Sequence, residues 1–321
     1  MNFVRSALQA WNRFFFTPQS PLPIALFRIL YGTAVVATLV LLRPDWLAWY
    51  GVDGWVRLAT ALKLEPGPRL NLFLLLPQSN AWIEGLFWVF LASATLLTVG
   101  FLTRLNSLLV FVCLASIQQR NLYILHGGDT FLRLAGFFLI FSPAGAALSL
   151  DRLIRVRLGK EPAAIQPRSP WAQRMIQLQL SALYLSSFFV KIKGAPWLQG
   201  TALFYVYTID DFRRFPLPSW FFHPLLIKLG TWLALALEFC LGTLIWVRKF
   251  RYCVLATGLI FHFWLEYSLN IPMFQWDILT AYVLFVDPDD LNRAIDWLGQ
   301  RFGLLTANSE GMPTLRGFRE G

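Results

Sequence analysis

Eight apolar segments recur along the chain, separated by shorter stretches rich in charged residues, proline and glycine. A helix of about 20 apolar residues spans a bilayer, so each segment predicts a membrane-spanning helix. The segments are residues 22–42, 81–100, 103–119, 129–148, 173–192, 224–246, 251–269 and 272–287. The third and the last are short, and seven spans is therefore the alternative. The predicted fold is an all-α, polytopic membrane helix bundle.

The two ends of the chain differ from these segments. The opening stretch MNFVRSALQAWNRFFF places Arg5 and Arg13 on a polar helical face, with aromatic residues opposite. Such a pattern is typical of a helix that lies in the membrane interface. We expect an interfacial helix within residues 1–21, a transmembrane domain over 22–290 and a polar cytoplasmic tail over 291–321.

The composition supports a membrane protein. Hydrophobic residues make up 56% of the 321 residues and charged residues only 14%, whereas soluble domains carry about 25% charged residues. In a soluble protein the formal net charge of +10 would point to nucleic acid. Membrane proteins instead concentrate Lys and Arg in cytoplasmic loops, so we expect no nucleic-acid partner.

The distribution of Lys and Arg predicts the orientation. The densest basic loop, DRLIRVRLGKEPAAIQPRSPWAQR at residues 151–174, follows the fourth apolar segment. Placing this loop in the cytoplasm puts both termini inside as well. At the outer end of the bundle this orientation gathers most polar residues of membrane depth, namely His126, Asp129, Lys191, His262, Glu266 and Asp277.

Ionisable groups inside a membrane face the bundle interior or a water-filled cavity by default. In RNLYILHGGDTFLRL, the residues His126, Asp129 and Arg133 share one face if a helix begins near Gly127. One interpretation is a helix cap at Asp129 with an internal Asp129–Arg133 ion pair. The other is a functional site, because a histidine titrates near neutral pH and is suited to proton transfer.

His262 and Glu266, in IFHFWLEYSL, are four residues apart and share a helical face. They form either a buried hydrogen-bonded pair or a tuned acid or base. No metal-ligand motif joins them to the other polar residues. The three cysteines all lie in apolar segments without ligand spacing, so we predict neither a disulfide nor a metal site.

Two lysines end the fifth segment, in FFVKIKGAPWLQG. Lys191 and Lys193 diverge by roughly 200° on a helix, so both cannot face the bundle. One interpretation is that they extend to the lipid head groups. The other is that one points inward, where burial favours a neutral amine that can act as a base.

Two longer stretches carry a family resemblance. YLSSFFVKIKGAPWLQGTAL, with Lys191, Trp197, Gly200 and Ala202, resembles a signature of the HTTM family, the transmembrane region shared by vitamin K-dependent gamma-carboxylases and many bacterial relatives. RNLYILHGGDTFLRLAGFFLIFSPAGAALSLD resembles the second strong block of this family. ALFRILYG and HFWLEYSLNIPMFQWDILTAYVLFVDP also fit, so the resemblance covers nearly the whole chain.

The resemblance implies a quinol-linked oxidoreductase or epoxidase-like enzyme of the inner membrane, with a reduced quinone such as menaquinone or vitamin K as cofactor and a lysine as base. By motif position Lys191 takes the lysine role, with His262 and His126 as proton carriers or quinone anchors. The residues implied at the cofactor site are Lys193, Trp197, Asp129, Arg133, Glu266 and Tyr184. A thiol-disulfide oxidoreductase-like protein is the implied redox partner.

Two departures from the family pattern bear on this implication. The animal carboxylases have adjacent lysines, whereas Ile192 separates Lys191 from Lys193, so which lysine is equivalent stays open. The sequence ends in a polar tail where those enzymes continue into a large lumenal domain, which argues against carboxylation of protein glutamate. The alternative function is a non-catalytic membrane protein that binds lipid or quinone, or that acts as a scaffold or transporter.

Overall fold

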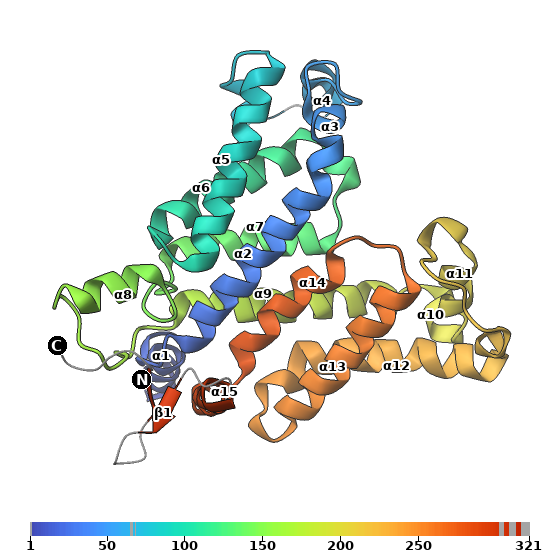
Figure 1. Ribbon diagram of the computed structural model, residues 1–321. Helices are drawn as coiled ribbons and strands as arrows, with labels where there is room; N and C mark the ends of the chain where they lie inside the picture. The colour runs from blue at the N-terminus through green and yellow to red at the C-terminus, as the bar shows by residue number, and fades with distance from the viewer. Residues whose placement is uncertain (1, 65–66, 68, 302–304, 308–312, 316–321) are drawn as a thin grey trace. The chain divides into compact units, whose positions relative to one another are not determined.

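Long helices make up most of the chain in the computed structural model, which describes residues 2–64, 67, 69–301, 305–307 and 313–315 (Figure 1). The chain divides into two compact units, Met1–Phe285 and Val286–Gly321. The first unit holds every predicted span except the end of the last one. Each unit is described by itself.

Each of the eight predicted segments contains a helix. The helices are α2 (Leu22–Leu42), α5 (Asn80–Val99), α6 (Thr103–Arg120), α7 (Gly127–Phe141), α9 (Trp171–Lys191), α12 (Pro224–Thr243), α13 (Arg248–Ser268) and α14 (Phe274–Leu279). Within the described residues, three stretches are long and apolar enough to cross a membrane by length and composition. They are Leu22–Tyr50, Asn80–Val99 and Pro224–Trp246.

Shorter elements connect the long helices. In the first unit they are α1 (Asn2–Phe16), α3 (Trp46–Tyr50), α4 (Leu58–Leu64), α8 (Leu150–Arg157), α10 (Ala195–Gln199) and α11 (Ala202–Thr208). Seven 3₁₀ turns complete this unit: η1 (Arg43–Asp45), η2 (Leu72–Leu74), η3 (Leu122–Ile124), η4 (Asp210–Phe212), η5 (Ser219–Phe222), η6 (Leu244–Trp246) and η7 (Thr280–Phe285). The second unit holds α15 (Pro288–Arg301), β1 (Leu305–Ala307) and β2 (Pro313–Leu315).

The all-α fold class is confirmed, and the second unit adds only a short antiparallel pair, β1 and β2, with Leu305 opposite Leu315. Two sequence predictions need correction. The fourth segment was predicted to run to residue 148, but α7 ends at Phe141, because Ser142 is extended ahead of Pro143. The last segment is not one α-helix, since α14 continues as the 3₁₀ turn η7.

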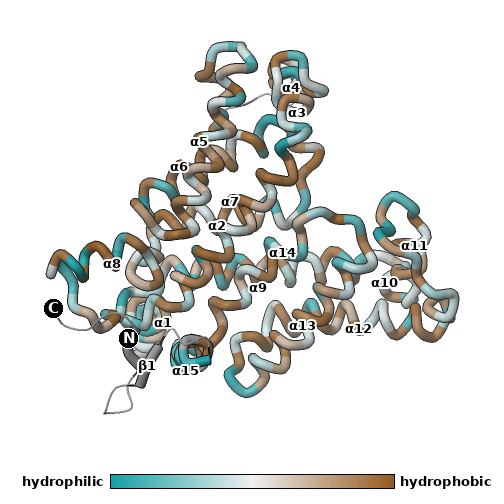
Figure 2. The backbone as a smooth tube through the Cα atoms, in the orientation of Figure 1, coloured by the Kyte–Doolittle hydropathy of each residue, from teal (hydrophilic) through white to brown (hydrophobic). Residues whose placement is uncertain are grey.

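The long helices pack in chain order, α2 against α5, α5 against α6, α6 against α7, α7 against α9 and α9 against α12. The turn η7 returns to pack against α2, and α14 contacts α7. The largest buried side chains include Phe27, Trp46, Phe87, Phe90 and Phe131, each 1% exposed or less. Figure 2 shows hydrophobic residues along the long helices and hydrophilic ones in α8 and the connecting loops.

One charged residue, Arg28, lies wholly inside this packing. Its guanidinium donates from Nη1 to the Ala144 carbonyl at 2.9 Å and from Nη2 to the Leu148 carbonyl at 2.5 Å. Nη2 also lies 3.5 Å from the Thr98 carbonyl. Because a buried charge needs polar partners, these bonds fix α2 against the loop after α7.

Candidate functional site

An apolar cavity of about 310 Å³ lies among α2, α6 and α7. Its walls are mainly aliphatic side chains from these helices, with Phe90 from α5 and Met273 from the turn before α14. Polar atoms come from five lining residues, Thr38, Tyr50, Gln118, His126 and Asp129. A mostly apolar cavity with a few polar groups is the usual form of a small-molecule site.

His126 and Asp129 meet at the first turn of α7. The His126 Nδ1 atom accepts hydrogen bonds from the backbone N–H groups of Gly128 at 3.1 Å and Asp129 at 3.3 Å. In return, the Asp129 carboxylate accepts from the His126 backbone N–H at 2.9 Å. This reciprocal arrangement is a capping box. The sequence predicted a cap at Asp129, and the structure divides that task between the two side chains.

The second ring nitrogen of His126 is also engaged. Nε2 lies 3.0 Å from the Pro272 carbonyl, and a carbonyl oxygen only accepts hydrogen bonds. Nε2 therefore carries the proton, while Nδ1 accepts from the backbone. His126 is held as a neutral imidazole with a fixed tautomer.

Gln118, which sequence reasoning did not select, lines the cavity from α6 and orients the same turn. Its Nε2 donates to the Asp129 backbone carbonyl at 2.9 Å. Its Oε1 is buried and has no hydrogen-bond partner. An unpaired buried acceptor costs free energy, so a ligand hydroxyl that reached Gln118 would gain a ready acceptor.

Asp277 of α14 joins His126 and Asp129. One ligand-type atom from each of the three residues lies within 4.8 Å of the other two. A metal ion fits this group poorly, because the Nδ1 lone pair of His126 already accepts two backbone N–H groups. The N-terminus of α7 is also the positive end of its dipole, which disfavours a cation.

A second polar cluster is buried between α9 and α13. The Tyr184 hydroxyl lies 2.6 Å from His262 Nε2 and 2.8 Å from the Tyr282 hydroxyl. The other ring nitrogen of His262, Nδ1, lies 2.5 Å from Gln275 Oε1. With Oε1 as acceptor, Nδ1 donates and Nε2 accepts from Tyr184. Hydrogen bonding therefore runs in one direction, from Tyr282 through Tyr184 to His262 and Gln275.

The lysine signature forms a third polar group. The Lys191 ammonium pairs with the Glu238 carboxylate of α12. It also lies over the Trp197 ring, 4.9 Å from the centroid, a distance at which a cation and an aromatic face attract. Lys193 is exposed. Glu238, an acid inside the apolar segment 224–246, thus has its partner in the structure.

The comparison with protein-family models decides the classification. The HTTM domain model matches residues 16–290. This chain belongs to the HTTM family. It is 22% identical over 291 residues to Sporulation-delaying protein SdpB of Bacillus subtilis (strain 168), an alignment that covers 87% of this chain and 85% of SdpB. No solved structure matches the chain significantly.

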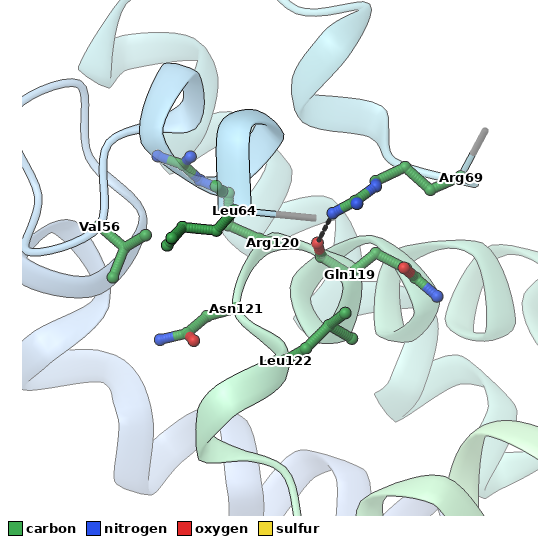
Figure 3. A pocket seen from close by; sticks show the side chains of 8 residues that line it. Val56, Leu64, Arg69, Gln119, Arg120, Asn121 and Leu122 are labelled. Carbon is green, nitrogen blue, oxygen red and sulfur yellow. Dashed lines mark hydrogen bonds between the residues drawn. The ribbon is translucent and has the colours of Figure 1, made fainter. Parts of the chain in front are cut away.

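In this HTTM protein, Arg120 forms a further buried polar site beside the cavity. It is 2% exposed, its Nε and Nη1 atoms have no hydrogen-bond partner, and its guanidinium lies 5.7 Å from the centroid of the Phe73 ring. Figure 3 shows a small space next to it, where Arg69 donates to the Gln119 carbonyl at 3.2 Å. The space is about 10 Å³, which is the size of one water molecule. We therefore interpret it as a hydration site.

The structure separates two pairs that the HTTM sequence had suggested. His262 bonds to Tyr184 and Gln275, whereas Glu266 pairs with Arg214, so the predicted His262–Glu266 pair is wrong. Within the described residues, Arg133 and Asp129 form no ion pair, and Arg133 Nη1 is buried without a partner. Asp129 instead caps its own helix together with His126, and Glu266 takes its partner, Arg214, from a neighbouring loop.

Six of the nine predicted site residues fall into three groups, and Lys193, Arg133 and Glu266 lie outside them. His126 and Asp129 line the cavity, Tyr184 and His262 share one network, and Lys191 and Trp197 lie together in a third place. Sequence reasoning missed Gln118, Tyr50, Gln275 and the pairing of Glu238. Only Glu238 carried a signal, because an isolated acid in an apolar segment requires a partner.

Proposed function

We propose that this HTTM protein binds a reduced quinone in the cavity among α2, α6 and α7 and acts as a quinol-linked oxidoreductase. The observation that carries the proposal is an apolar cavity of about 310 Å³ that has His126, Asp129 and Gln118 in its wall. Drug-sized ligands occupy cavities of roughly 300–1,000 Å³. A quinone ring with the beginning of an isoprenoid tail is in this range.

The polar groups favour the reduced form of the ligand. The Asp129 carboxylate and the Gln118 Oε1 atom are acceptors, and Oε1 has no hydrogen-bond partner. A quinol presents hydroxyl donors to such groups, whereas an oxidised quinone presents only carbonyl acceptors. The bound quinol would pass two electrons to the disulfide of the thiol-disulfide oxidoreductase-like partner, which would be reduced to two thiols. The residues of the cavity would relay the two protons that the quinol releases.

By motif position Lys191 takes the role of the family's base, and its contacts suggest how it could accept a proton. An ammonium group paired with a carboxylate cannot accept a proton. If Lys191 Nζ passed its proton to Glu238, the neutral amine left behind could accept a proton from the ligand. Glu238 Oε2 is buried without a partner, so the carboxyl group has a free position.

We further propose a multi-pass protein of the inner membrane with eight spans and both termini inside. The basic loop that contains α8 supports this orientation. The exposed apolar residues Val4, Leu8 and Trp11 of α1 support an interfacial position for that helix.

A binding or scaffold function is the second candidate. Lys191 does not line the cavity, and His126 and His262 both have structural partners. These contacts are also consistent with a protein that holds a quinone or lipid without turnover. The similarity to SdpB does not distinguish an enzyme from a binding protein, because the name of SdpB states no catalytic activity.

Purified protein in nanodiscs would be incubated with reduced menaquinone, and oxygen would be supplied as electron acceptor in the turnover assay. Binding would be followed by calorimetry and products by mass spectrometry. Leu114→Trp would fill the cavity, and Leu105→Trp on the exposed side of the same helix is its control. We expect the first to abolish binding and the second to leave it unchanged. Equal binding in both variants would refute the cavity as the site. Binding without oxidised product would select the scaffold function.

The same assay separates the two lysines. If Lys191 is a base, Lys191→Ala abolishes turnover while Lys193→Ala keeps it. If turnover persists in both variants and is lost in Asp129→Asn, the acid–base group belongs to the cavity alone.

A further inference from the structure

Two carboxyl groups approach each other at the wall of the cavity, Asp277 fully buried and Asp129 with a side chain 24% exposed. Asp129 comes from the first turn of α7, and Asp277 from α14, which packs against it. Their oxygens lie within 4.8 Å of each other. Asp277 is 1% exposed and its Oδ1 has no hydrogen-bond partner. An unpartnered, buried carboxylate oxygen is costly, so the pair requires a proton or a cation.

No basic side chain neutralises this pair. Among the described residues, the only ion-pair contact within 4.0 Å of either carboxylate is with His126. His126 Nδ1 lies 3.3 Å from Asp129 Oδ2, but it also accepts the backbone N–H groups of Gly128 and Asp129, so the backbone engages this nitrogen. Two ionised carboxylates would thus stand side by side, one of them fully buried.

The backbone compensates for only part of this charge. The carboxylates lie at the N-terminus of α7, where the helix dipole is equivalent to about half a positive charge. The Asp129 carboxylate also accepts the His126 backbone N–H. These contacts favour one negative charge at the site and leave a second uncompensated.

On α7 itself, Arg133 lies one turn from Asp129 but forms no ion pair with either carboxylate among the described residues. The side chains that approach the pair from the other elements packed against α14 carry no positive charge. From α2, the Tyr31 hydroxyl interacts electrostatically with Asp277 but has no hydrogen-bond partner. From α13, His262 bonds to Gln275, and from η7, Tyr282 bonds to Tyr184. All three side chains are neutral or engaged elsewhere.

We propose that Asp129 and Asp277 share one proton, and that this pair is the acid–base group of the cavity. Like charges at this separation do not both ionise when buried. The role in the cavity rests on the proposed quinol binding. Asp129 accepts the proton when the ligand's O–H bond breaks, a new carboxyl O–H bond forms, and the pair changes from one negative charge to none. The ligand keeps the electron pair as an oxygen anion.

Infrared spectroscopy tests the pair directly, because a protonated carboxyl group has a carbonyl band that an ionised one lacks. Purified wild-type protein at neutral pH is compared with Asp277→Asn, Asp129→Asn and Asp210→Asn, the last at an acid whose side chain is 83% exposed. We expect the band in the wild type and in Asp210→Asn, and its loss in both variants of the pair.

Each other outcome overturns the proposal. If the wild-type protein lacks the band, both carboxylates are ionised. This result comes from the wild-type protein alone, so it does not depend on whether the variants fold. A band that survives Asp129→Asn shows that burial alone keeps Asp277 protonated. Loss of the band on adding one equivalent of Zn²⁺ or Mn²⁺, with a raised Tm, shows a cation site instead. Because no quinol is present, failure here is distinct from failure of quinol binding.

Discussion

The ammonium of Lys191, the last residue of α9, pairs with the carboxylate of Glu238 in α12. The Glu238 side chain is 7% exposed and that of Lys191 is 26% exposed. The buried carboxylate therefore needs the lysine as a partner for its charge, whereas water can solvate part of the lysine. This relationship gives the family's lysine a structural role beside any catalytic one.

Removing the lysine should destabilise the protein. Breaking a fully buried ion pair costs about 3–5 kcal/mol, and partial exposure of Lys191 lowers our expectation for Lys191→Met to about 2 kcal/mol. Lys193→Met, at an exposed position, should change stability by less than about 0.5 kcal/mol. Unfolding in detergent would measure both.

A double variant separates charge from packing at the same pair. Glu238→Leu in the Lys191→Met background should recover most of the lost stability, because no charge is then left unpaired. Additive losses in the double variant would contradict this account.

Tyr184→Phe should weaken the contact between α9 and α13. It removes the hydroxyl that donates to His262 and leaves that buried acceptor unpaired, at a cost of about 1–3 kcal/mol. Tyr205→Phe, at a side chain 56% exposed, is the matched control and should be neutral. Thermal unfolding in detergent distinguishes them, and equal melting temperatures would exclude the directed network.

Gly128→Ala should perturb the cavity more than Gly127→Ala. A Cβ atom at Gly128 would lie 3.0 Å from the His126 ring and 3.1 Å from Asp277 Oδ2, whereas at Gly127 the closest atom is a Phe274 carbon at 3.4 Å. Crowding of this kind costs about 1–3 kcal/mol. We expect a lower Tm and weaker quinol binding for the first variant. The opposite order would show that the turn is not tightly packed.

Low pH should remove the stability that the ion pairs of Glu161 give to the basic loop between α8 and α9. The hydrogen bond from Arg155 lowers the pKa of Glu161 below 4.5, and the neighbouring Arg168 lowers it as well. Partial burial raises this pKa, but by less than the two arginines lower it. A lowered pKa gives stability that is present above the unfolded value and lost as the pH falls through the folded value. The stability difference between wild type and Glu161→Gln should therefore vanish in acid. A difference that persists there would contradict the ionic account.

The local pattern of the sequence predicted the helices well, and the site only in part. Apolar length located each long helix to within a few residues, and the spacing of His126 and Asp129 identified a shared first turn at Gly127. The end of α7 was missed because Ser142 and Pro143 break the helix inside an apolar segment. The suggested Asp129–Arg133 and His262–Glu266 pairs do not form, because Asp129 caps its own helix with His126 and Glu266 pairs with Arg214 of a neighbouring loop.

The sequence by itself determined that this is a helical membrane protein and that costly polar residues lie in its apolar segments. Tertiary structure alone decided which of them meet. Lys191 and Glu238 are 47 positions apart, and Tyr184 and His262 are 78 apart. Periodicity tells which residues share a face of one helix. It does not tell how neighbouring helices are rotated or at what height they pack, and these two quantities choose the partner of each buried charge.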